Sequence, residues 1–175
     1  MSVDETLIQI VDAALAEAAR KSGPWLVCRA GCTECCMGPF PITQLDARRL
    51  REGLAELESR DIERAARVRE RARQAAAETA TDDDPCPALD PETGTCDLYA
   101  ARPITCRIFG PPVRYGSDAV GICELCFQGA SDEEIAACQV EIDPQGLESR
   151  LSEELERTTG ARGQTIVAFA LLAAQ

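Results

Sequence analysis

The chain has 175 residues, with 30 acidic against 18 basic side chains and a formal net charge of −12. This acidity argues against nucleic acid as the default partner, because binding to phosphate needs a basic face. Hydrophobic residues make up 45% of the chain and aromatic residues only 4%, so we expect a thin apolar core, since large side chains bury most of the area.

The N-terminal segment predicts a helix over residues 3–20. Ser2 and Glu5 form a capping box, and the apolar residues that follow recur at helical spacing. The segment has no basic region and no continuous apolar run, so it does not read as a secretory signal. Three prolines, two glycines and four cysteines over residues 24–42 predict a structured loop after this helix.

Two further helices are predicted in the next part of the chain. Thr43 is a good N-cap and Asp46 is favourably placed in the first turn behind it. Leucines give this helix an apolar side, and Gly53 is a candidate break. Residues 59–80 are rich in Ala, Arg and Glu, with opposite charges four residues apart, and predict a strong helix.

The middle of the chain combines an irregular segment with a short helix. Residues 86–116 are rich in Cys, Pro and Gly, which predicts irregular structure. A second capping box, formed by Ser131 and Glu134, predicts a helix over residues 132–139.

The C-terminal part predicts two more helices. Asp143 followed by Pro144 is typical of an N-cap and a first helical position, and Gly160 is placed to end the helix. Residues 165–174 predict a buried helix, with a strand as the alternative. This run is too short to span a bilayer, which takes about 20 apolar residues.

The chain contains ten cysteines and no histidine. Without a secretory signal, we expect a cytoplasmic location, where thiols stay reduced. In such a compartment ten cysteines indicate metal or redox chemistry rather than structural disulfides. A secreted protein held together by disulfides is the alternative.

The spacing of the cysteines favours metal binding. The C-x-x-C pattern occurs twice, and it lets two sulfurs from one tight turn reach the same ion. Without histidine, a site made of thiolates suits either zinc or an iron–sulfur cluster. The predicted ligands are Cys28, Cys32, Cys35, Cys36, Cys86, Cys96, Cys106, Cys123 and Cys126.

Three of the cysteines raise separate questions. Cys35 and Cys36 are adjacent, and neighbouring side chains usually diverge, so the pair should serve two centres or supply one ligand only. Cys36 as a small buried hydrophobe is the other interpretation. Cys138 lies on a predicted helix among alanines and is interpreted as a buried structural residue.

Four arginines close to cysteines in sequence are hypothesised donors to sulfur, because a site with four thiolates and Zn²⁺ keeps a net negative charge. The alternative is that they are ordinary surface side chains. They are Arg29, Arg102, Arg107 and Arg114.

The stretch CPALDPETGTCDLYAARPITCRIFG, residues 86–110, together with the first four cysteines, resembles the YkgJ-type, or CxxCxxCC, family of zinc- or iron-chelating cysteine-cluster proteins. The first gap is three residues, where the family has two. The resemblance implies a metal-chelating domain without naming the metal. A lysine methylase that is similar across this domain keeps catalysis open. The matching residues of the second element are Cys86, Pro87, Leu89, Asp90, Gly94, Cys96, Tyr99, Arg102, Pro103, Cys106, Arg107 and Phe109.

We therefore predict a mainly α fold: a small helical domain with irregular cysteine-rich loops organised around metal. A single domain is expected over residues 1–175, with a cysteine-cluster core at about 26–126 and helical flanks at 1–22 and 131–175.

The predicted function is chelation of zinc or an iron–sulfur cluster through thiolates. The alternatives are an iron–sulfur-dependent enzyme of redox or methyl-transfer chemistry, and a thiol redox sensor. Enzymatic activity is left open and no catalytic residue is assigned. The expected partner is a metal ion, with neither nucleic acid nor a membrane, and a protein partner stays open.

Overall fold

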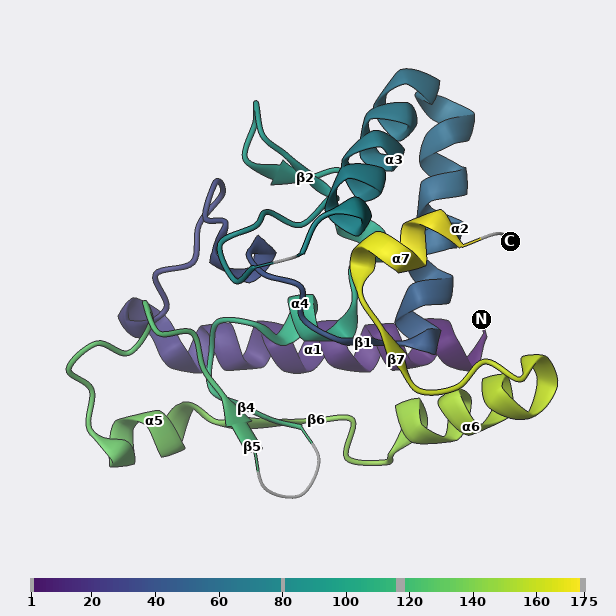
Figure 1. Ribbon diagram of the computed structural model, residues 1–175. Helices are drawn as coiled ribbons and strands as arrows, with labels where there is room; N and C mark the ends of the chain where they lie inside the picture. The colour runs from purple at the N-terminus through teal and green to yellow at the C-terminus, as the bar shows by residue number, and fades with distance from the viewer. Residues whose placement is uncertain (1, 80, 116–118, 174–175) are drawn as a thin grey trace. The chain divides into compact units, whose positions relative to one another are not determined.

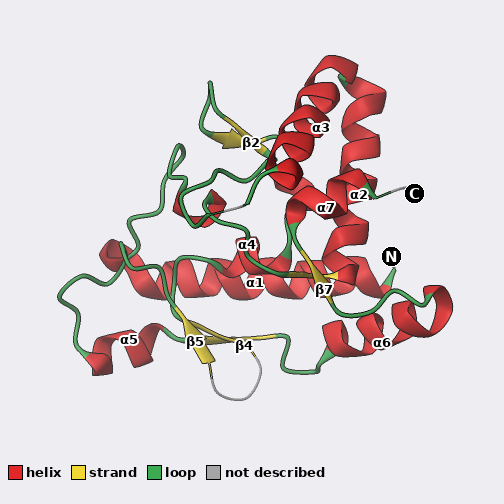
Figure 2. Ribbon diagram, viewed as in Figure 1, coloured by secondary structure: helices red, strands yellow, loops and turns green. Residues whose placement is uncertain are grey.

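The computed structural model describes residues 2–79, 81–115 and 119–173. Two compact units are distinguished: unit 1 comprises Met1–Arg29 and Ile104–Glu154, and unit 2 comprises Ala30–Pro103 and Leu155–Gln175. Helices dominate both units and the strands are short (Figure 2), which confirms the mainly α fold. The single domain over 1–175 stays a prediction. None of the helices described is both long and apolar enough to cross a bilayer.

Unit 1 is built on the long helix α1, which contacts β6, α4 and α5 (Figure 1). Its small sheet has β4 in the centre, antiparallel to β5 and parallel to β6. Its elements are α1 (Val3–Ser22), η1 (Gly23–Trp25), α4 (Ile104–Ile108), β4 (Val113–Tyr115), β5 (Ala119–Gly121), α5 (Asp132–Cys138), β6 (Val140–Ile142) and most of α6 (Leu147–Thr159).

Both predicted capping boxes of unit 1 are confirmed. The Ser2 hydroxyl accepts from the Glu5 N–H at 3.1 Å, and the Glu5 carboxylate accepts from the Ser2 N–H at 2.6 Å. Ser131 and Glu134 repeat this exchange at the start of α5. Each box satisfies helix N–H groups that have no partner within the helix, which fixes where the helix begins.

Asp143 caps helix α6 from a greater distance than the sequence predicts. The helix begins at Leu147, so Pro144 is not its first residue. The Asp143 backbone adopts φ +52°, and its two carboxylate oxygens accept from the N–H groups of Leu147 and Glu148, each at 2.8 Å. The carboxylate therefore still serves the helix N-terminus, across a turn that the sequence pattern did not indicate.

Unit 2 is a helical layer with two small β-pairs. Helices α2 and α3 lie side by side and α7 contacts both (Figure 1). Strand β1 pairs antiparallel with β7, and β2 pairs antiparallel with β3. The elements are η2 (Glu34–Cys36), β1 (Ile42–Thr43), α2 (Gln44–Arg60), α3 (Ile62–Ala77), β2 (Leu89–Asp90), β3 (Thr95–Cys96), η3 (Tyr99–Ala101), the end of α6, β7 (Gln164–Thr165) and α7 (Val167–Leu172).

The boundary between α2 and α3 differs from the prediction. The Thr43 hydroxyl caps α2 as expected, accepting from the Asp46 N–H at 3.1 Å. The helix continues through Gly53, so a break at that glycine is wrong. The chain turns at Asp61 instead, whose carboxylate accepts from the Arg64 N–H at 2.9 Å and caps α3. The predicted helix over 59–80 therefore begins later, at residue 62.

The apolar core of unit 2 is formed by the facing sides of α2, α3 and α7. The predicted C-terminal helix is confirmed over Val167–Leu172, while Thr165 lies in a strand and residues 174–175 fall outside the described part. Alanines on α3 and α7 let these helices approach closely, which suits a chain poor in large side chains. Core residues include Leu50, Leu54, Leu57, Ala65, Val68, Ala72, Val167, Ala170 and Leu171.

Gly53 is required by close packing inside unit 2. A Cβ atom placed on Gly53 would lie 2.3 Å from the Cβ of Ala101 in η3, far inside van der Waals contact. Glycine is less favourable than alanine inside a helix, but at this position it leaves the space that η3 needs to pack on α2.

We predict that Gly53→Ala lowers the melting temperature. In an unconstrained helix this change would stabilise by roughly 0.5–1 kcal/mol, but here the contact with Ala101 should cost about 1–3 kcal/mol. The melting temperature, followed by circular dichroism, should fall by about 2–10 °C. A rise would show that η3 does not pack on α2 in this way.

Candidate metal centre

The fold separates the nine predicted ligands into two groups. Unit 2 contains Cys32, Cys35, Cys36, Cys86 and Cys96, whereas unit 1 contains Cys28, Cys106, Cys123 and Cys126, together with Cys138. The division falls inside the first cysteine block, between residues 29 and 30. All ten cysteines are free thiols.

In unit 2, a short 3₁₀ turn and one backbone hydrogen bond bring Cys35, Cys36 and Cys86 into one region. The turn η2 carries Cys35 and Cys36, with the Cys36 N–H donating to the Thr33 carbonyl at 2.7 Å. The Cys86 N–H then donates to the Cys36 carbonyl at 2.6 Å. Residues 50 apart in sequence are thereby joined through their backbones.

Cys96 joins the same region through the β2–β3 hairpin. Cys96 is the cross-strand partner of Leu89, and the Leu89 N–H donates to the Cys86 carbonyl at 2.8 Å. The hairpin is closed at Gly94, with φ +65° and its N–H donating to the Asp90 carbonyl at 2.9 Å. These contacts place Cys86 and Cys96 at the base of one hairpin.

The Cys35 and Cys36 sulfurs lie 4.0 Å apart. The expectation that these neighbouring side chains diverge is therefore wrong. Two thiolates bound to one tetrahedral zinc, with bonds of roughly 2.3 Å, would lie about 3.8 Å apart. This spacing is close to that of two ligands of one ion.

The thiols of Cys35, Cys36, Cys86 and Cys96 shift one another's pKa values. The hydrogen bond from Cys36, with a contribution from the Arg102 charge, lowers the pKa of Cys35 to about 6. The pKa of Cys36 is raised by that same hydrogen bond, by burial and by the charges of Cys35, Cys86 and Cys96. Burial raises the pKa of Cys86 to about 11 and also raises that of Cys96. Gathering four thiolates here is unfavourable without a compensating cation.

The donor chemistry of this group fits zinc or iron, because thiols offer soft sulfur donors. The nearby positive charge of Arg102 would offset part of the negative charge of several thiolates. Arg102 also lies 3.9 Å from the centre of the Tyr99 ring, which orients its guanidinium. No three Cys, Asp or Glu side chains among the described residues are arranged to hold one ion without moving. The fold thus brings these cysteines into one region without forming a complete coordination site among the described residues.

In unit 1, Cys28 and Cys123 both lie next to Gly110. A Cβ on Gly110, whose φ is +127°, would lie 3.0 Å from the Cys28 sulfur, and the Gly110 carbonyl accepts from the Cys123 N–H at 3.1 Å. The Cys126 N–H closes a tight turn onto the Cys123 carbonyl at 2.9 Å. Burial, followed by the neighbouring Cys126 thiol, raises the pKa of Cys123. Cys106 lies four residues before Gly110, on α4.

Aromatic rings cover the buried cysteines of unit 1. Trp25 and Phe127 stack with their ring centres 6.2 Å apart, and the Phe127 N–H donates to the Trp25 carbonyl at 3.1 Å. Cys123 and Cys126 are each 4% exposed in this cluster. Cys138 packs in the same cluster and donates its thiol to the Lys21 carbonyl at 3.3 Å, as a buried structural cysteine would.

Two of the arginines hypothesised as sulfur donors have other partners. Arg107, which is buried, donates to Asp12 of α1 at 2.8 Å. Arg114 lies against the side-chain amide of Gln139. The charge of Arg102 favours the thiolate forms of Cys35 and Cys96. Sequence spacing did not reveal Asp97 and its partners Arg64 and Arg71. The available signal was that Asp97 directly follows Cys96, a predicted ligand.

Comparison with known proteins adds one match. Residues 27–139 match the family model described as "CxxCxxCC: Putative zinc- or iron-chelating domain". This range is more than half of the chain and includes all ten cysteines. No curated protein and no solved structure matches the chain.

Proposed function

The chain belongs to the CxxCxxCC family, whose domain is described as zinc- or iron-chelating, and from this premise we propose that it binds zinc or iron through thiolates at two separate centres, one in each unit. The centre in unit 2, which we call centre A, draws on Cys32, Cys35, Cys36, Cys86 and Cys96. The centre in unit 1, centre B, draws on Cys28, Cys106, Cys123 and Cys126.

The observation that carries the proposal is the convergence of cysteines in centre A, where the Cys35 and Cys36 sulfurs lie 4.0 Å apart and the Cys86 N–H donates to the Cys36 carbonyl at 2.6 Å. The hydrogen bond with Cys35, burial and the charges of Cys35, Cys86 and Cys96 all raise the pKa of Cys36. Such a group is unfavourable as bare thiolates and favourable around a cation, because a bound metal keeps coordinating thiols deprotonated. With no histidine in the chain, sulfur is the donor that these sites offer.

Centre B is supported by the tight turn at Cys123 and Cys126 and by the approach of Cys28 to Gly110. The stacked rings of Trp25 and Phe127 would limit access of water to this centre. A reducing, cytoplasmic location belongs to the same proposal, because the ligands must stay reduced. An iron–sulfur-dependent enzyme, a thiol redox sensor and a protein partner stay predictions.

Titration of the reduced, metal-free chain with Co²⁺ tests the proposal. We expect thiolate-to-cobalt charge-transfer bands that saturate at about two equivalents, with the visible bands of tetrahedral coordination. Saturation at about one equivalent would support a single centre. Absence of charge-transfer bands would contradict metal binding by these thiols.

We predict that Cys106→Ser lowers both cobalt stoichiometry and thermal stability, because the free energy of ligation is part of the free energy of folding. The stoichiometry should fall from about two to about one equivalent. Cys138→Ser is the matched control, since it also removes a thiol of unit 1 but should leave the stoichiometry unchanged. Full stoichiometry in Cys106→Ser would remove Cys106 from the ligands.

A further inference from the structure

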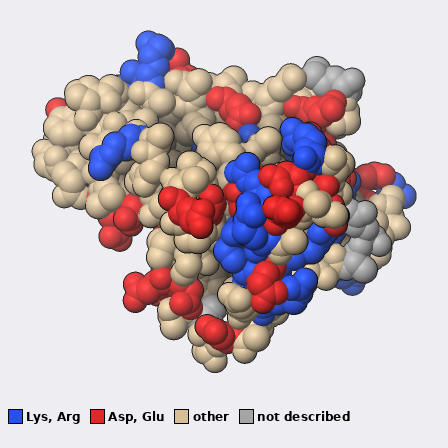
Figure 3. Space-filling view, turned by 90° about the horizontal axis from the view of Figure 1, so that it is seen from above, with Lys and Arg blue, Asp and Glu red and all other residues tan. Residues whose placement is uncertain are grey.

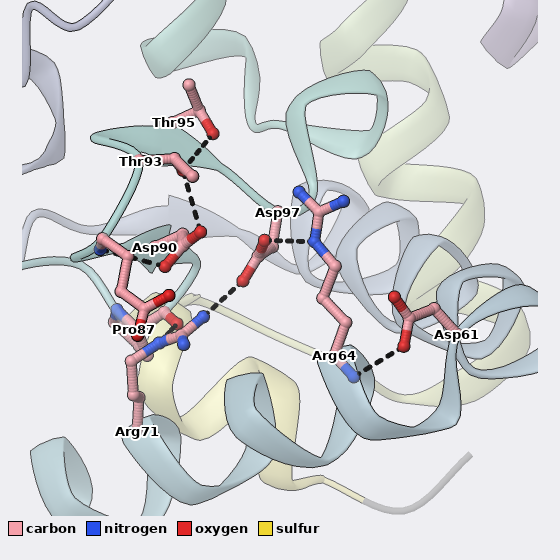
Figure 4. A network of polar contacts seen from close by, with 9 residues as sticks. Asp61, Arg64, Arg71, Pro87, Asp90, Thr93, Thr95 and Asp97 are labelled. Atoms are coloured by element: carbon pink, nitrogen blue, oxygen red, sulfur yellow. Dashed lines mark hydrogen bonds and ion pairs between the residues drawn. The ribbon is translucent and has the colours of Figure 1, made fainter.

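A buried carboxylate in unit 2 is paired with two arginines of α3. The side chain of Asp97 is 2% exposed, and each of its oxygens accepts one hydrogen bond at 2.5 Å, from Arg64 Nε and from a terminal nitrogen of Arg71 (Figure 4). A buried carboxylate is costly unless it is paired and hydrogen-bonded. The two arginines therefore fix Asp97 against α3.

The same contacts reach the backbone next to two cysteines of centre A. Asp97 directly follows Cys96, and Arg71 Nε also donates to the carbonyl of Pro87, which directly follows Cys86, at 2.9 Å. The Asp97 N–H donates to the Ala88 carbonyl at 2.7 Å. One guanidinium thus contacts both chain segments that carry these cysteines.

Other arginines of this region form ordinary surface pairs. Arg73 pairs with Glu70 one turn away on α3, with both side chains more than half exposed. Arg69 pairs with Glu58 of α2, and both are partly exposed. Figure 3 shows arginines and carboxylates lying next to one another across one face of the molecule. Such pairs contribute little to stability, in contrast to the pairing of buried Asp97.

The tip of the β2–β3 hairpin is closed by contacts that do not involve these arginines. The Asp90 carboxylate accepts from the Thr93 hydroxyl at 2.8 Å and from the Glu92 N–H at 3.1 Å, and the Thr93 and Thr95 hydroxyls lie 2.7 Å apart (Figure 4). The hairpin turn should therefore survive loss of the Asp97 pairing, whereas the anchoring of its base on α3 should not.

We propose that Arg64, Arg71 and Asp97, which we call the arginine clamp, are positioning residues that hold Cys86 and Cys96 at a fixed separation and so slow the release of metal from centre A. The inference rests on the proposed function. Groups that orient metal ligands without touching the metal typically contribute 10–100-fold to metal affinity. Because the clamp acts on two ligands at once, its effect should appear in the rate of metal loss.

The test compares Asp97→Asn with the unchanged chain, both loaded with Co²⁺. Asparagine keeps the shape of the side chain and removes its charge. Cobalt release to excess EDTA, followed by the loss of the charge-transfer bands at a temperature well below unfolding, should show two phases of similar amplitude. We expect the phase of centre A to accelerate about 10–100-fold in Asp97→Asn, and the phase of centre B to keep its rate. Cys86→Ser, which lacks centre A, identifies the phase.

Three further variants separate positioning from general stabilisation. Arg73→Ala removes an arginine of α3 outside the clamp and should release cobalt at the unchanged rate. Leu50→Ala destabilises the core of unit 2 without touching the clamp and should also keep that rate. Arg71→Lys keeps the charge but loses the two-sided hydrogen bonding, and should give an intermediate rate; it also serves if Asp97→Asn does not fold.

The outcomes distinguish the two proposals. If the unchanged chain binds no cobalt, the proposed function fails and the clamp fails with it. If cobalt binds and Asp97→Asn and Arg71→Lys release it at the unchanged rate, the clamp is wrong while the proposed function stands. Equal acceleration in Asp97→Asn and Leu50→Ala would overturn positioning and leave a purely structural role.

Discussion

The Cys86→Ser variant is expected to lose centre A and to melt well below the unchanged chain. Cys86 is packed against the apolar core of unit 2, and its N–H donates to the Cys36 carbonyl. Burial, followed by the charges of Cys96 and Cys35, raises its pKa. A serine oxygen is a poor substitute for a soft thiolate. Removing this ligand should therefore affect both metal binding and the backbone arrangement around it.

The size of this effect follows from the coupling of ligation to folding. Structural zinc contributes apparent binding free energies of about 10–16 kcal/mol, so losing one of its ligands should cost several kcal/mol. The melting temperature should then fall by about 10 °C or more. Calorimetry together with metal analysis of the same sample checks both parts. Unchanged metal content with only a small shift in melting temperature would show that Cys86 is not a ligand.

Leu50→Ala is expected to give the second large effect, through packing alone. Leu50 is 1% exposed and belongs to the core formed by α2, α3 and α7. Truncating a buried leucine costs about 2–5 kcal/mol, because the loss of apolar burial is joined by the cost of a cavity. The melting temperature should fall by about 5–15 °C, with cobalt stoichiometry unchanged in the folded chain.

Ile62→Ala is the matched control for this prediction. Ile62 starts α3 in the same unit, but 68% of it is exposed, so its truncation should change the melting temperature little. If both variants behaved alike, the packing of α2 described here would be incorrect. If Leu50→Ala lost cobalt while folded, the core and the metal would be more tightly coupled than the contacts indicate.

Local features of the fold could be predicted from sequence because they depend on neighbouring residues. The capping boxes at Ser2 and Ser131 and the cap at Thr43 need only a few adjacent side chains, and all three are confirmed. The predicted helix break at Gly53 is wrong, because the role of this glycine is set by its contact with Ala101, which is 48 residues away in sequence. Asp61 lies inside the helix predicted over residues 59–80, and its role as the N-cap of α3 depends on the chain turning there.

The candidate site was predictable in composition but not in arrangement. Cysteine spacing and the family resemblance indicated which cysteines are candidate ligands, and the residues that match the family model contain all of these candidates. Spacing could not show that Cys28 falls in unit 1 while Cys32 falls in unit 2, since tertiary contacts decide that division. The pairing of Asp97 with Arg64 and Arg71 joins residues 33 and 26 positions apart, beyond the reach of any local pattern.

The expectation of a thin apolar core is also refined by the structure. Unit 2 compensates for few large side chains with alanines that let three helices pack closely. In unit 1, three of the buried cluster residues are cysteines, covered by Trp25 and Phe127. Metal binding should therefore matter for the stability of both units.

Elemental analysis of the full chain, purified without oxygen, tests the central claim most directly. Thiolate ligation predicts either zinc at about two atoms per chain or iron accompanied by inorganic sulfide, with most of the ten thiols protected from a thiol reagent until a chelator is added. A chain that carries neither metal, whose thiols all react at once and whose melting temperature ignores the chelator, would contradict the claim.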